Sequence, residues 1–177
     1  MATSFTINRA PVLTLWAAVV AQRLGYHHDA ALTLGRAVAG LNAQAKAQRL
    51  GIARPADART ATKRAAVHRA AHAKVVELMG RHVPVVKTPE GLRAAAEGRP
   101  DTPESVERYL ESRFGEHLAA SRTAMTTLAR SVPKDELNER AFALYEAFRP
   151  DTPAGKKGWG AKGVLDLARI AKLAAGT

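Results

Sequence analysis

The sequence predicts an all-α protein, a compact orthogonal bundle of five to six helices packed around a central apolar first helix. Long stretches of the chain repeat apolar residues every three or four positions, as helices with one buried face do. Proline or aspartate stands where most of these stretches begin, and glycine stands where several end. Alternation of apolar and polar residues, which half-buried strands require, is nowhere sustained. We therefore expect one helical domain over residues 1–177.

The first helix is predicted over residues 11–24. Pro11 suits a first helical turn, where its missing N–H costs nothing, and Gly25 suits the stop. Apolar residues cover almost the whole circumference of this segment, which is typical of a helix buried at the centre of a fold. We expect Trp16 to be buried against the second and fourth helices.

The second helix is predicted over residues 29–50, with Asp29 as its N-cap and Gly51 as its end. Its small residues Gly35, Ala39 and Gly40 would let another helix approach closely, so this face is a candidate surface for a homo-oligomer. The first two helices also fit a helix-turn-helix, whose reading residues would be His28, Thr33 and Arg36. An ordinary helical hairpin explains the same pattern, and it is favoured because this helix is too long for a typical recognition helix.

The middle of the chain is predicted as a third helix over residues 60–79, followed by an internal connector over residues 80–102. Residues 83–86 form a short apolar piece that contains Pro84. They suit an extended segment, but a single strand would have no partner in an all-α chain.

The second half is predicted as helices over residues 103–130, 133–148 and 164–175. A Gly/Lys-rich loop over residues 150–163 would precede the last of these helices. The string Arg-Pro-Asp-Thr-Pro begins at Arg99 and again at Arg149, and we interpret both copies as a turn followed by a helix cap.

The charge of the chain is strongly positive and unevenly distributed. Lys and Arg number 27 against 16 Asp and Glu, for a formal net charge of +11. The first hundred residues hold 15 of these bases and only 5 of the acids. A one-sided basic field attracts polyanions, since binding to phosphates releases their counterions. The excess of Arg over Lys and the high Ala content offer an alternative, in which the charge merely reflects a GC-rich genome.

These observations lead to two hypotheses for function. The first is a non-enzymatic protein that binds nucleic acid, DNA rather than RNA, mainly through phosphates. The second is a helical protein-interaction or scaffold protein. The residues expected to contact nucleic acid are Arg36, Lys46, Arg49, Lys63, Arg64, Arg69, Lys74, Lys156, Lys157, Trp159 and Lys162.

The Gly/Lys-rich loop contains Gly158, Gly160 and Gly163 at the spacing of a dinucleotide fingerprint. That fingerprint has meaning only between a strand and a helix, and a helix is predicted before it here, so we reject a Rossmann site. The glycines and lysines would still suit an anion cradle at a helix N-terminus, with Trp159 stacking on a base. The alternative, which we favour slightly, is that Trp159 fills the core and the glycines let the chain turn around it.

Catalytic, metal and cofactor sites are not expected. The chain has no cysteine, which excludes disulfides and thiolate ligands. His68 and His72 share one helix face at a metal-ligand spacing, but Arg69 stands where a peptidase would need glutamate, and no third ligand is evident. The carboxylates of residues 101–150 alternate with arginines as on an ordinary solvated face. With no signal peptide and no membrane span evident, a cytoplasmic location is expected.

Overall fold

The protein is a mixed helix-and-sheet structure, so the all-α prediction is wrong. The computed structural model describes residues 4–49, 74–96, 99–150 and 162–176, except the side chains of residues 46–49 and 96. Its helices are α1 (Arg9–Arg23), α2 (His28–Arg49), α4 (Pro103–Phe114), α5 (Leu118–Ser131), α6 (Lys134–Phe148) and α7 (Leu167–Gly176). A 3-10 turn, η1 (Gly115–His117), joins α4 to α5.

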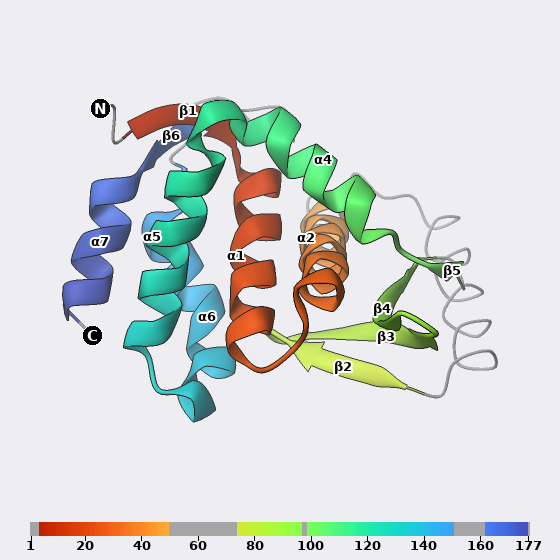
Figure 1. The fold of residues 1–177 in the computed structure, drawn as a ribbon. Helices are drawn as coiled ribbons and strands as arrows, with labels where there is room; N and C mark the ends of the chain where they lie inside the picture. Colours follow the sequence, from red (N-terminus) through yellow and green to blue (C-terminus); the bar gives the residue numbers. More distant parts are fainter. Residues whose placement is uncertain (1–3, 50–73, 97–98, 151–161, 177) are drawn as a thin grey trace.

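Two antiparallel sheets accompany the helices. One has two strands, β1 (Ser4–Asn8) and β6 (Lys162–Asp166), and the other has the order β2-β3-β4-β5. The strands of the second sheet are β2 (Val75–Leu78), β3 (Arg81–Thr88), β4 (Gly91–Ala96) and β5 (Arg99–Pro100). Helix α1 runs through the middle of the molecule (Figure 1), with the four-stranded sheet on one side and α7 with the β1–β6 pair on the other.

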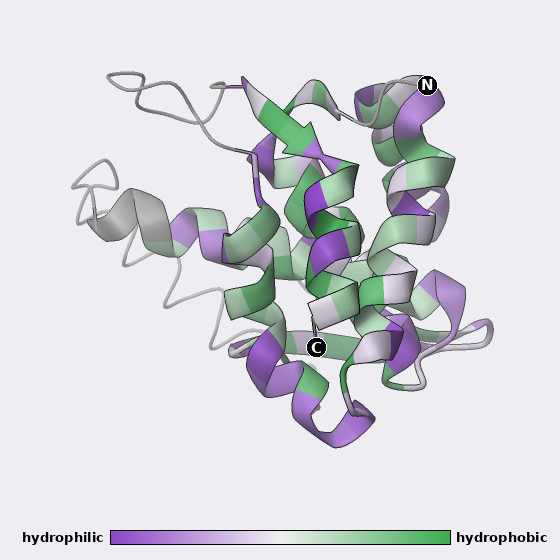
Figure 2. Ribbon diagram, turned by 90° about the vertical axis from the view of Figure 1, so that its left-hand side faces the viewer, coloured by the Kyte–Doolittle hydropathy of each residue, from purple (hydrophilic) through white to green (hydrophobic). Residues whose placement is uncertain are grey.

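Helix α1 forms the centre of the core, as predicted. All residues from Pro11 to Ala21 are buried, because no face of this segment is polar enough to meet water. Trp16 is fully buried, and two of its contacts are with α6: its Nε1–H donates to the carbonyl oxygen of Ala141 at 2.9 Å, and its ring meets Phe148 edge-on. The prediction of burial is confirmed. In Figure 2, hydrophobic and hydrophilic residues alternate along the helices, as in helices with one buried face, and the start of α6 at the bottom is hydrophilic.

The small residues of α2 are used inside the chain. A Cβ atom on Gly35 would overlap the carbonyl oxygen of Thr14 and lie 2.8 Å from the amide nitrogen of Ala18, so glycine here permits the close packing of α2 on α1. Gly40 has open space around its Cα. The part of this face around Gly35, which we considered for an oligomer, is therefore occupied by α1.

Residues 75–78, 81–88, 91–96 and 99–100 form strands, where the end of a third helix and a connector were predicted. Leu78 and Arg81 are joined by the two-residue turn Met79-Gly80, and both turn residues have positive φ, as the twist of a tight hairpin requires. Val83 and Val85 face the core, and β3 is paired on both sides, with β2 and β4. The predicted helix over residues 60–79 is thus wrong at residues 75–78, and its earlier part lies outside the described residues.

The other two corrections concern the second half. The predicted helix over residues 103–130 is interrupted at Gly115, whose φ of 57° lies in a region that favours glycine, and it becomes α4 and α5. The predicted helix over residues 164–175 begins later, because residues 162–166 pair with residues 4–8 as β6 and β1. Phe5, Ile7 and Leu165 point inward from this pair, and Val164 is exposed.

No helix within the described ranges is both long enough and apolar enough to cross a bilayer.

Candidate nucleic-acid interface

The structure describes the side chains of three residues expected to contact nucleic acid: Arg36, Lys74 and Lys162. Lys46 and Arg49 lie on the last turns of α2, where only the backbone is described. The remaining candidates fall outside the described residues: Lys63, Arg64, Arg69, Lys156, Lys157 and Trp159. His68 and His72 also fall outside them, and the described residues contain no cluster that could hold a metal ion.

Lys74 lies next to Lys87, a residue that the sequence analysis did not select. The amide N–H of Val85 donates to the carbonyl oxygen of Lys74 at 3.2 Å, so Lys74 stands opposite Val85 and diagonal to Lys87 on the same face of the hairpin. Both lysines are exposed. Hydrogen bonding to Lys87, and then the charge of Lys87, lower the pKa of Lys74 below its ordinary value. Two cations are therefore held together where the chain enters the sheet.

Arg36 is partly committed to neighbours on the segment that leads into α4. One terminal nitrogen, Nη1, donates to Ser105 Oγ at 2.9 Å and to Asp101 Oδ1 at 3.4 Å. The side chain remains more than a third exposed, so this contact orients the guanidinium group without removing it from solvent.

Tyr109 joins Arg36 to a second arginine, Arg113. The Cζ atom of Arg36 lies 5.8 Å from the centre of the Tyr109 ring, and that of Arg113 lies 5.6 Å from it. Both distances suit cation–π attraction. Burial raises the pKa of Tyr109, and the charges of Arg113 and Arg36 partly oppose that shift. The phenol is therefore neutral at physiological pH and acts as a spacer between the two guanidinium groups.

Several other arginines are paired with carboxylates and hold the fold together. Arg93 is almost completely buried and lies 3.8 Å from Asp29, while Nη2 of Arg122 donates to both carboxylate oxygens of Glu107, at 2.9 and 3.1 Å. Further pairs are Arg140–Glu136 and Arg149–Glu146. Arg93, whose side chain is only 9% exposed, is a poor candidate for binding phosphate. The other three arginines have, like Arg36, a carboxylate partner with which a phosphate would compete.

The helix-turn-helix alternative does not fit α2. Thr33, one of its expected reading residues, is fully buried; its hydroxyl donates to Ala30 and accepts the amide N–H of Ala94 in β4. The β4 strand thus covers the part of α2 that would have to enter a groove of DNA.

Lys162 is exposed on β6, opposite Asn8 of β1. The β1–β6 pair and the β2–β3 hairpin lie at opposite sides of the molecule (Figure 1). The structure therefore does not bring Lys162 to the Lys74–Lys87 pair, although Lys162 and Lys74 were both predicted to contact nucleic acid.

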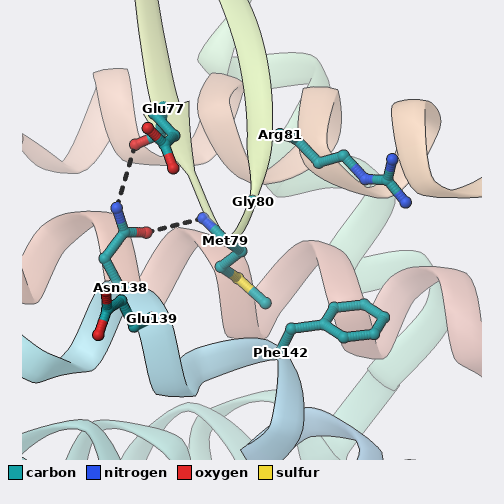
Figure 3. A pocket seen from close by; sticks show the side chains of 7 residues that line it. All are labelled: Glu77, Met79, Gly80, Arg81, Asn138, Glu139 and Phe142. Atoms are coloured by element: carbon teal, nitrogen blue, oxygen red, sulfur yellow. Dashed lines mark hydrogen bonds between the residues drawn. The ribbon is translucent and has the colours of Figure 1, made fainter.

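The hollow at the β2–β3 turn is acidic rather than basic. It has a volume of about 370 Å³ and is lined by Glu77, Met79, Gly80, Arg81, Asn138, Glu139 and Phe142. Figure 3 shows Asn138 bridging the turn: its Oδ1 accepts the N–H of Met79 at 2.7 Å, and its Nδ2 donates to the carbonyl oxygen of Glu77 at 3.3 Å. Arg81 points away from Asn138 and donates to Asn42 of α2 at 3.0 Å. This amide fixes the strained turn, in which Met79 has a positive φ, to α6.

Comparison of the chain with protein-family profiles, with curated proteins and with solved structures found no match.

Proposed function

We propose that this protein binds nucleic acid, DNA rather than RNA, through phosphate contacts and without catalysing a reaction. The observation that carries the proposal is the concentration of charge before the four-stranded sheet. Residues 46–74 hold eight Lys and Arg and a single acid, Asp57. This stretch ends at Lys74, beside Lys87, so the most basic part of the chain leads directly into a pair of exposed lysines.

The lysine pair is a reasonable place for a phosphate because its two charges repel each other in the free protein. A phosphate between them would replace this repulsion with two favourable contacts, and it would raise the lowered pKa of Lys74. Two lysines that served only to keep the protein in solution would gain nothing from lying side by side. Phosphate contacts of this kind provide affinity but no base selectivity.

The test is a binding titration with random-sequence DNA, both duplex and single-stranded, over a series of salt concentrations. The wild type should bind with an affinity that falls steeply with salt. The double variant Lys74→Gln/Lys87→Gln should flatten the log–log slope for duplex DNA by about 1–2 units, because each lost phosphate contact removes about 0.9.

The matched control is Lys134→Gln/Lys172→Gln, which removes the same charge from two exposed lysines on α6 and α7. It should change the slope much less, because these lysines lie on other elements of the molecule. Absence of salt-dependent binding by the wild type would refute the proposal. Equal losses in the two double variants would show that only the total charge matters.

A further inference from the structure

Helix α4 carries its glutamates and Arg113 on different sides. At 100° per residue, Glu104, Glu107 and Glu111 fall on the side of the helix opposite Tyr109. Ser105, Ser112 and Arg113 fall on the same side as Tyr109. The side-chain contacts agree with this division, since Glu107 accepts from Arg122 of α5 while Ser105 and Tyr109 contact Arg36 of α2.

The adjoining helix α2 brings Arg36 to this side of α4. Its Nη1 donates to Ser105, and its Cζ atom lies 5.8 Å from the centre of the Tyr109 ring. Among the described residues, the acid that contacts this side is Asp101, which accepts from Arg36. The flank where α2 and α4 meet thus carries Arg36 and Arg113 against one acid, Asp101, whereas the opposite side of α4 carries three glutamates.

Arg113 and Tyr109 give this flank a second property besides charge. Arg113 is exposed, and its guanidinium group lies over the Tyr109 ring at 5.6 Å. A planar cation supported by an aromatic ring presents a flat surface on which an unpaired base can stack. In a duplex the bases are already stacked on one another, so they are not free to stack on the Arg113 guanidinium group.

We propose that the α2–α4 flank, centred on Arg113 and Tyr109, receives an unpaired base of single-stranded nucleic acid, with Arg36 at a neighbouring phosphate. This inference rests on the proposed function and narrows it, because it predicts preference for single strands over duplex. A wild type that binds duplex as tightly as single-stranded DNA would contradict it.

The decisive variant is Arg113→Lys, which keeps the charge but removes the planar group. Binding of a short fluorescent single-stranded DNA and of the corresponding duplex should be measured for the wild type and this variant. We expect the variant to bind the single strand about 5- to 100-fold more weakly, as for the loss of one stacked base, with duplex binding and its salt slope unchanged. Tyr109→Leu, which removes the supporting ring, should show the same selective loss.

Arg130→Lys is the control, since Arg130 is an exposed arginine on α5 and its replacement should leave both affinities unchanged. Circular dichroism of each variant verifies the fold. A wild type that binds neither DNA would refute the proposed function itself. A wild type that binds, together with an Arg113→Lys variant that loses nothing or loses both forms equally, would refute this inference alone.

Discussion

The helices around α1 and the four-stranded sheet are held in place by different kinds of contact. Around α1 the contacts are almost entirely apolar, with Trp16, Leu15 and Phe148 fully buried. The sheet also buries an apolar face, but polar side chains tie it to the helices: Thr33 to β4, Asn42 to Arg81, and Asn138 to the β2–β3 turn. Apolar packing produces a periodic pattern of apolar residues in the sequence, whereas single side-chain hydrogen bonds produce no pattern.

The largest effect should come from the apolar region. Trp16→Ala should lower the free energy of unfolding by about 3–5 kcal/mol, because it opens a cavity and leaves the carbonyl oxygen of Ala141 without its donor. Chemical denaturation followed by circular dichroism measures this change. An unchanged transition midpoint would show that α1 does not organise the core.

The contact between α1 and α2 gives a prediction with an internal control. Gly35→Ala should destabilise the protein by about 1–3 kcal/mol, since the new methyl group would overlap the backbone of α1. Gly40→Ala, five residues later on the same helix, should stabilise it by up to about 1 kcal/mol, because its surroundings are open. If both alanines had the same effect on thermal unfolding, the close approach of the two helices would be wrong.

The polar attachment of the sheet can be tested at Asn138. Asn138→Ala should cost about 1–3 kcal/mol, because the N–H of Met79, itself a buried residue, loses its acceptor. Hydrogen exchange should locate the loss of protection in β2 and β3 and leave α1 and α6 protected. Asn138→Asp keeps an acceptor for Met79 and should be milder, so equal effects of the two variants would argue against the bridge.

The smallest effect on stability should come from Tyr145, which links α6 to the start of α1. Tyr145→Phe should cost less than about 1 kcal/mol at neutral pH, since the hydroxyl donates to the carbonyl oxygen of Arg9 over a long 3.5 Å. Burial raises the pKa of Tyr145 to about 12, so the folded state favours the neutral phenol. Its contribution to stability is complete below the ordinary pKa of 10.0 and is lost as the pH rises towards 12.

Absorbance titration of the phenolates checks this assignment. One tyrosine of the native wild type should ionise near pH 12, and that step should be absent in Tyr145→Phe. An unaltered titration curve would mean that another tyrosine is responsible.

The contrast between the two regions also explains which parts of the fold the sequence could predict. Helices α1, α2 and α6 were predicted within one or two residues, because their apolar residues repeat at helical spacing and prolines or glycines mark their limits. The segment Val75–Leu78 was wrongly predicted as helical, because two apolar residues three positions apart suit a helix as well as a strand. The pairing of Thr6 with Val164 joins residues at opposite ends of the chain, and no local pattern indicates it.

The candidate site was predictable to a similar degree. Arg36 and Lys74 could be named from charge alone, but Lys87 becomes a neighbour of Lys74 only through the register of the β2–β3 hairpin. Tyr109 and Arg113 were missed although their spacing of four residues on a predicted helix was visible. The pattern that could have revealed them is an aromatic residue followed four positions later by an arginine on the same helical face, with glutamates on the opposite face.

The most direct test of the account is a map of the amides whose NMR signals shift when a short single-stranded DNA is added to the protein. We predict that the shifts concentrate at Lys74 and Lys87, along α2 from Arg36 onward, and on the Tyr109 side of α4. Signals from α6, α7 and the β1–β6 pair should remain in place. Shifts spread evenly over the surface, or centred on α7, would contradict the proposed interface.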